Sequence, residues 1–295
     1  MEINVEEERK KYAITEEQFQ ENASEIFGKL SIQATKSENP KFIIVGGQAG
    51  AGKTDLVSSK YRELGYNAVI IDQDELRTMY PAEVYQRILA NHNDRGEFLI
   101  LNPYIAKMIK EIVMRSKDAG YNIILETALN DVEAFIDYTK DLHANGYTTE
   151  LSVLSVPEIE GHISMLTRYC YYLERDGECR RNTRINPKAG ENIRNNIEKL
   201  DNLNIFDDIE VFIRNPHRSN EDLEPIKIYS QKENQYEQPL EAFERGKKMG
   251  MKDTIKGFQD KYEHIKIVLE QFGETQKLET LEEIRARFNS LDERE

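Results

Sequence analysis

The chain has 295 residues and a formal net charge of −14, with 40 Lys and Arg against 54 Asp and Glu. A chain of this length buries roughly three quarters of its unfolded surface and needs no disulfide or metal to hold a core. The acidic balance opposes broad contact with nucleic acid or anionic lipid, and the two cysteines form no CxxC pair. No apolar run approaches the ~20 residues of a membrane span, so we expect a soluble cytoplasmic protein without nucleic-acid or membrane partners.

Residues 1–40 are predicted to form an N-terminal helical segment. The first 11 residues are mostly charged, and we expect them to be frayed. A capping box from Thr15 to Gln18 then opens a helix. Apolar residues recur at helical spacing after it, at Phe19, Ala23, Ile26, Phe27 and Leu30. This stripe predicts a helix that packs on the core that follows.

From residue 41, short β-branched runs alternate with helical stretches. The runs lie at 42–45, 68–71, 123–125, 151–156 and 209–213. Strands separated by helices favour right-handed crossovers and a doubly wound, mainly parallel sheet with helices on both faces. We therefore predict an α/β core over residues 41–215.

Residues 216–295 have a different composition. The polar segment 216–239 is interpreted as a linker. Apolar residues at helical spacing across 255–272 and 278–288 then predict amphipathic helices. We interpret this part of the chain as a helical C-terminal extension.

The strongest chemical signal is a complete G-x-x-x-x-G-K-[ST] pattern directly after the first strand. In such a loop, glycines let backbone N–H groups face the β-phosphate, the lysine neutralises phosphate oxygens and the final hydroxyl holds Mg²⁺. The predicted nucleotide-binding residues are Gly47, Gln48, Ala49, Gly50, Ala51, Gly52, Lys53 and Thr54, the last also as metal ligand. All eight residues fall where this mechanism requires them, which favours a nucleotide site over a plain glycine-rich turn.

Carboxylates follow two later strands. Asp72 and Asp74 come at the end of the second strand, and Glu126 ends the third. Ligands bind at the carboxyl ends of strands in open α/β sheets, and period-two alternation would send Asp72 and Asp74 to the same side. Either aspartate could take a substrate proton while the other supports Mg²⁺ or a neighbouring backbone group, and Glu126 would bind a metal or a substrate hydroxyl. The alternatives are solvated or helix-capping carboxylates.

A basic cluster extends from Arg168 to Arg184 in this acidic chain. Arginine supplies planar, multidentate donors for a phosphoryl group in transfer, often from a mobile lid. We predict such a lid near residues 163–188, with Arg168 and Arg184 closing over the phosphates. The alternative is a solvated helix face paired with nearby acidic residues.

Taken together, the motifs resemble the zeta-toxin kinases from about Ile14 to Asn215. Beside the phosphate loop, the shared features are residues 71–74, 103–104, 120–122, 126, 156–157, 168–169, 183–184 and 187–188. The resemblance implies a P-loop kinase that uses ATP or GTP and Mg²⁺ to phosphorylate the 3′-hydroxyl of UDP-N-acetylglucosamine, which would block cell-wall synthesis. It also implies an antitoxin protein that blocks the nucleotide site.

The resemblance further assigns roles to single residues. The catalytic residues are Lys53, Asp74, Arg168 and Arg184, with Asp74 as the base and the two arginines as phosphate clamps. Among the predicted substrate-binding residues, Glu126 matches the strand-end glutamate that the family places near the substrate sugar. We predict that Asp72, Glu111 and Thr127 bind the substrate beside it.

Three positions depart from the family pattern. Tyr80–Pro81 replaces a His-Pro pair, Thr127–Ala128 replaces a Gly-Thr pair, and Lys110 aligns with a substrate-side glutamate, although Glu111 is adjacent. These departures leave open a P-loop kinase with another small-molecule hydroxyl as acceptor. The alternative from a different class is a non-catalytic NTP-binding regulatory protein.

Overall fold

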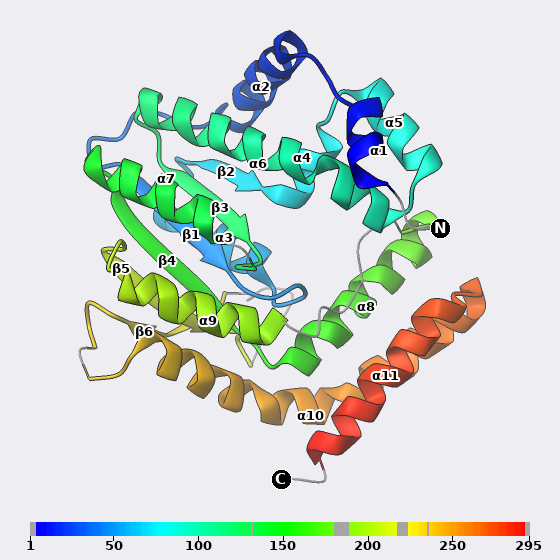
Figure 1. The fold of residues 1–295 in the computed structure, drawn as a ribbon. Helices are drawn as coiled ribbons and strands as arrows, with labels where there is room; N and C mark the ends of the chain where they lie inside the picture. Colours follow the sequence, from blue (N-terminus) through cyan, green and yellow to red (C-terminus); the bar gives the residue numbers. More distant parts are fainter. Residues whose placement is uncertain (1–3, 131, 180–188, 217–223, 235, 293–295) are drawn as a thin grey trace. The chain divides into compact units, whose positions relative to one another are not determined.

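The computed structural model describes residues 4–130, 132–179, 189–216, 224–234 and 236–292 (Figure 1). The chain divides into two compact units. Unit 1 comprises Met1–Ile44, Lys60–Thr127 and Glu133–Glu150, and unit 2 comprises Val45–Ser59, Ala128–Val132 and Leu151–Glu295. The boundaries at residues 40 and 215 that composition suggests stay a prediction.

A single sheet positions the motifs. Within the described residues, six strands are hydrogen-bonded in the order β2-β3-β1-β4-β5-β6. β2 and β3 are parallel, and β5 and β6 are antiparallel. The strands are β1 (Lys41–Gly46), β2 (Val69–Asp72), β3 (Ile123–Thr127), β4 (Thr148–Ser155), β5 (Asp208–Ile213) and β6 (Ile226–Ser230). The predicted α/β fold with a mainly parallel sheet is confirmed, and each of the five predicted strands is present.

The interpretation of residues 216–239 as a linker is wrong, because this segment contains β6. The strand pairs with β5 through its backbone, and its burial is confined to Tyr229 and Ser230. Two side-chain contacts add to the pairing: Ser230 Oγ donates to Asp208 at 2.8 Å and Lys227 Nζ donates to Glu210 at 2.8 Å. Because burial does not alternate along this strand, the strand depends on its pairing with β5, which composition does not reveal.

Unit 1 is built around one long helix. α6 (Asp94–Ala119) packs against α1 (Val5–Lys11), α2 (Glu16–Leu30), α4 (Gln73–Thr78), α5 (Ala82–Asn91) and α7 (Glu133–Ala144). The capping box that starts α2 is confirmed, with Thr15 and Gln18 bonded reciprocally. The expected fraying is wrong for the part of this segment that the structure describes: Val5–Lys11 is helical, and Arg9 donates twice to the backbone oxygen of Leu99, at 2.9 and 3.1 Å. Residues 1–3 lie outside the described residues.

Unit 2 contains α8 (Glu158–Asp176), α9 (Ala189–Asn202), α10 (Pro239–Phe272) and α11 (Thr275–Asp292), and α3 (Lys53–Glu63) follows the phosphate loop. α8, α10 and α11 lie side by side in Figure 1 and share one apolar core. Its fully buried side chains include Ile163 and Cys170 of α8, Ile265 and Leu269 of α10 and Leu281 of α11. The amphipathic C-terminal helices predicted from the sequence are confirmed.

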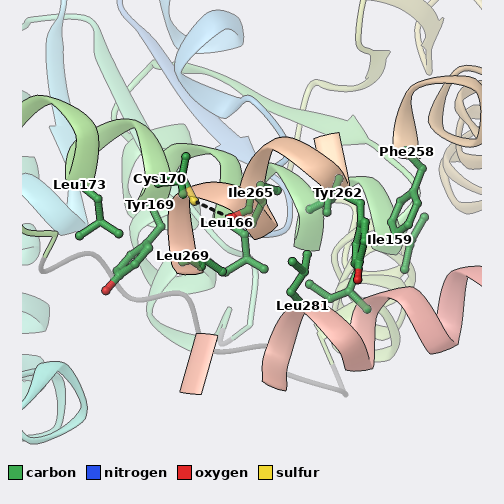
Figure 2. Close-up of a cluster of buried hydrophobic side chains, with 13 residues drawn as sticks. Ile159, Leu166, Tyr169, Cys170, Leu173, Phe258, Tyr262, Ile265, Leu269 and Leu281 are labelled. Atoms are coloured by element: carbon green, nitrogen blue, oxygen red, sulfur yellow. Dashed lines mark hydrogen bonds between the residues drawn. The ribbon is translucent and has the colours of Figure 1, made fainter. Parts of the chain in front are cut away.

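Figure 2 shows how this core encloses Cys170. Its Sγ lies 3.9 Å from the backbone oxygen of Ile265, and burial raises the pKa of the thiol to about 12. Such a thiol stays protonated and packs as a small apolar group. α8 is therefore held on one face by the two C-terminal helices.

Among the helices that the structure describes, none is long and apolar enough to span a membrane.

Candidate active site

The phosphate loop connects β1 to α3 and contains two glycines with left-handed backbone. Their φ angles are +74° at Gly50 and +92° at Gly52, a conformation that costs little only for glycine. α3 begins at Lys53, whose Nζ donates to the backbone oxygen of Gln48 at 3.4 Å. The loop thus combines left-handed glycine turns, a lysine and a helix N-terminus, which is an arrangement suited to binding a phosphate.

The start of α8 supports this loop from one side. Gln48 Nε2 donates to the backbone oxygens of Pro157 at 2.9 Å and Val156 at 3.3 Å. Gly161 approaches so closely that a Cβ there would lie 2.9 Å from the backbone oxygen of Ala49. Only glycine fits at this contact, so the conformation of the loop is tied to the helix that carries Arg168.

Arg214, which sequence reasoning missed, supports the loop from its carbonyl side. It follows β5 directly, and its Nε donates to the backbone oxygen of Ala51 at 2.8 Å, while Nη2 donates to the backbone oxygen of Gly50. Nη1 donates to Glu160 at 2.6 Å. The only signal in the sequence is an arginine at the end of a predicted strand, which by itself does not indicate a contact with a loop some 160 residues earlier.

Thr54 is exposed in the first turn of α3. Across the described part of the chain, no group of three or more His, Cys, Asp or Glu side chains is arranged to hold a metal ion. In phosphate loops, a hydroxyl at the position of Thr54 shares a cation with the phosphate oxygens.

Asp72 is the last residue of β2 and caps the next helix. Its Oδ1 accepts from the backbone N–H of Asp74 at 2.7 Å, which is the bond of a helix N-cap. The expectation that strand alternation places Asp74 on the same side is wrong, because α4 starts at Gln73 and Asp74 is helical. The Asp74 carboxylate is 63% exposed and lies 2.7 Å from Arg77 Nη1.

Glu126 lies beside Asp72 in the sheet. The two residues are register partners in the parallel pair of β2 and β3. Thr127 follows as the last residue of β3 and is buried, whereas Glu126 is partly buried. The structure thus brings the predicted strand-end residues Asp72, Glu126 and Thr127 together, next to the turn of helix that carries Asp74.

Glu111 lies in the middle of α6 and has an ionic partner on the same helix. Its Oε1 accepts from Arg115 Nε at 2.8 Å, and Arg115 also donates to Ser24 Oγ and Gln20 Oε1 of α2, each at 2.9 Å. This predicted substrate residue therefore takes part in joining α6 to α2.

Tyr80, at the first departure from the family pattern, is a packing residue. Its hydroxyl donates to the backbone oxygen of Tyr12 at 2.6 Å, its ring meets Tyr104 edge to face at 4.5 Å, and burial raises its pKa to about 12.

Arg168 is exposed on α8, while its neighbours Tyr169 and Cys170 point into the apolar core. The second predicted clamp, Arg184, lies outside the described residues, as does the part of the predicted lid from residue 180 to 188. The structure thus places the predicted phosphate clamp Arg168 on a helix whose opposite face packs against α10 and α11.

Comparison with known proteins identifies the family. The family model described as "Zeta toxin" matches residues 25–233. The chain belongs to the zeta toxin family. It is 30% identical to toxin zeta of Streptococcus pyogenes over 288 residues, covering 91% of this chain and 92% of that protein. Toxin zeta of Enterococcus hirae is 28% identical over 282 residues, with 92% and 90% covered.

A solved structure from the PezAT chromosomal toxin-antitoxin system of Streptococcus pneumoniae has the same fold. It aligns with a TM-score of 0.72 and 22% identity, and covers 87% of this chain and 98% of the other. In this zeta toxin family member, the family match includes the phosphate loop, the strand-end carboxylates, α8 and β6. The match ends before α10, but the streptococcal relative covers enough of the chain to include most of the C-terminal helices.

Proposed function

We propose that this zeta toxin family protein is a kinase that transfers the γ-phosphoryl group of ATP or GTP to the 3′-hydroxyl of UDP-N-acetylglucosamine. The observation that carries the proposal is the phosphate loop, with left-handed Gly50 and Gly52 ahead of a helix that starts at Lys53. A glycine-rich loop of this conformation, followed directly by a helix N-terminus, suits the phosphates of a nucleotide.

The loop residues fit a nucleotide and its cation. Lys53 would neutralise charge on the β- and γ-phosphate oxygens, the N–H groups from Gly50 to Lys53 would bind the β-phosphate, and Thr54 would bind the cation. Mg²⁺, when bound, would offset the negative charge that develops on the transferring group. Arg168 would add a planar donor for the same charge, as would Arg184.

Asp74 is the proposed base. In the reaction, the acceptor oxygen bonds to the γ-phosphorus, the bond from that phosphorus to the bridging oxygen breaks, and the hydroxyl proton passes to the Asp74 carboxylate. An exposed carboxylate oriented by Arg77 suits this role, because it stays accessible to an acceptor hydroxyl. Asp72, Glu126, Thr127 and Glu111 are the proposed acceptor-binding residues.

The identity of the acceptor rests on the family. The departures at Tyr80, Lys110 and Thr127 keep another small-molecule hydroxyl as the alternative acceptor. Tyr80 is engaged in packing, so it does not replace the chemistry of a histidine at that position.

An antitoxin partner and a cytoplasmic location are further parts of the proposal. The solved relative comes from a toxin-antitoxin system, and an antitoxin that covered the nucleotide site would silence the kinase described here. The acidic composition and the two free thiols suit a reducing cytosol.

The test is incubation of the protein with ATP, Mg²⁺ and a panel of UDP sugars, read by mass spectrometry. We expect one added phosphate on UDP-N-acetylglucosamine and none on an analogue that lacks the 3′-hydroxyl of the amino sugar. The Lys53→Ala variant is the inactive control. Phosphate on a different acceptor would replace the proposed substrate. Tight ATP binding without transfer to any acceptor, in wild type and Asp74→Asn alike, would favour the regulatory NTP-binding protein.

A further inference from the structure

Arg214 joins the phosphate loop to a buried carboxylate shared with the C-terminal helix α10. We propose that Arg214 is a positioning residue that holds the loop in its phosphate-binding conformation, and that Glu160 and Lys261 set the position of Arg214. This inference rests on the proposed nucleotide site and assigns a role to residues that lie outside the phosphate-loop motif.

Arg214 fixes the direction of two backbone carbonyls in the phosphate loop. Arg214 Nε holds the backbone oxygen of Ala51 at 2.8 Å, and Nη2 holds that of Gly50. A trans peptide places its C=O and N–H on opposite sides, so the N–H of Gly52 faces away from Arg214. Fixing the carbonyl of Ala51 therefore orients one of the N–H groups with which a phosphate loop binds its anion.

Geometry explains why this residue is an arginine. One guanidinium makes contacts in three directions: to the two loop oxygens and, through Nη1, to Glu160 at 2.6 Å and Ser164 Oγ at 3.1 Å. Arginine presents five N–H donors in a rigid plane, whereas lysine presents a single flexible ammonium group. A lysine at position 214 keeps the charge but reaches only part of this set.

Glu160 anchors the arginine from the side opposite the loop. Its side chain is 9% exposed, and its Oε1 accepts from Arg214 Nη1 and from Lys261 Nζ, each at 2.6 Å. Ser164 Oγ completes the set at 3.1 Å. A buried carboxylate with two cationic partners has little freedom to move, because loss of either partner leaves charge uncompensated.

Lys261 extends the network to the C-terminal helices. It lies in α10 between Phe258 and Tyr262, which are buried in the core that α10 shares with α8 and α11. The chain of contacts thus leads from α10 through Lys261, Glu160 and Arg214 to Gly50 and Ala51. Through these contacts, the part of the chain beyond the family match contributes to the proposed nucleotide site.

The test separates phosphate binding from general stability. We would measure the affinity of the full-length protein for ATP and for inorganic tripolyphosphate, both with Mg²⁺, by calorimetry. For Arg214→Lys we expect both affinities to fall by about tenfold and by the same factor. The loop amides bind the phosphates that both ligands contain, so the loss does not depend on the nucleobase of ATP. Its thermal midpoint without ligand should stay close to that of wild type.

Arg245→Lys is the matched control. Arg245 makes a similar set of contacts in unit 2, with Glu237 at 2.8 Å and the backbone oxygen of Ile228 at 3.2 Å. This variant should bind both ligands like wild type. Glu160→Gln should reproduce the loss in Arg214→Lys in weaker form, and Lys261→Met should change the affinity less than Glu160→Gln does.

Unchanged tripolyphosphate affinity in Arg214→Lys, with wild type binding normally, would overturn this inference alone. If Arg214→Lys does not fold, Glu160→Gln decides in its place by the same criterion. If wild type binds neither ATP nor tripolyphosphate, the proposed nucleotide site fails and this inference fails with it.

Discussion

The phosphate loop and the strand-end carboxylates are both candidate site regions, but structure constrains them in different ways. In the loop, Gly50 and Gly52 have a left-handed backbone. Gly161 lies in close contact with the loop, and Arg214 donates a hydrogen bond to the backbone oxygen of Ala51. At the carboxylates, Asp72 already serves as a helix cap, and Asp74 pairs with Arg77 within one turn of helix.

The difference shows how far a short pattern can be trusted. Eight consecutive residues in the loop have to satisfy one backbone conformation, so few structures other than a phosphate site use that pattern. A carboxylate at a strand end also caps helices and forms local ion pairs, and these uses need no ligand. The loop therefore predicts its chemistry from sequence, whereas each carboxylate needs a separate experiment.

The largest effect is expected from Lys53→Ala. In the proposed kinase, this change removes the cation that would face the β- and γ-phosphates, so phosphoryl transfer should fall by on the order of 10³-fold or more. Initial rates with saturating acceptor measure this loss, and circular dichroism checks that the fold is intact. A folded variant with wild-type rates would remove the loop from the catalytic site.

Asp74→Asn tests whether the carboxylate region contains the base. Nucleotide affinity should be retained, while turnover should fall by on the order of 10² to 10⁴-fold, which is the usual share of general-base catalysis. Asp72→Asn is the comparison, since asparagine caps a helix about as well as aspartate. A larger turnover loss in Asp72→Asn than in Asp74→Asn would reverse the assignment.

Arg168→Lys tests the anchored helix α8 as a source of phosphate contacts. The change keeps the charge but loses the planar fork, so kcat should fall by about tenfold while ATP affinity changes less. Arg175→Lys is the matched control, because Arg175 is also exposed on α8 and pairs with Asp176 at 2.5 Å. Equal losses in both variants would show a general effect of the helix surface.

The smallest effect is expected from Asp72→Ala, which removes the N-cap of α4. The free energy of unfolding should fall by ~1 kcal/mol, and Asp72→Asn should restore most of it. Chemical denaturation measures both values. If Asp72→Ala leaves stability unchanged but lowers turnover, Asp72 acts on the substrate and its capping bond is incidental.

Much of this protein is determined by local sequence. The capping box at Thr15, the strands of the parallel core, the phosphate loop and the apolar faces of the C-terminal helices are each present as predicted. These features depend on residues a few positions apart, because helix and strand periodicity and turn chemistry act over that range.

Tertiary structure decided the rest. β6 forms because β5 offers its edge, and α1 is held at Arg9 by the backbone of Leu99. Arg214 meets Ala51 across more than 160 residues of chain. Contacts of this separation leave no periodic signal in the sequence, since they are selected by geometry in the folded chain and not by the neighbours of each residue.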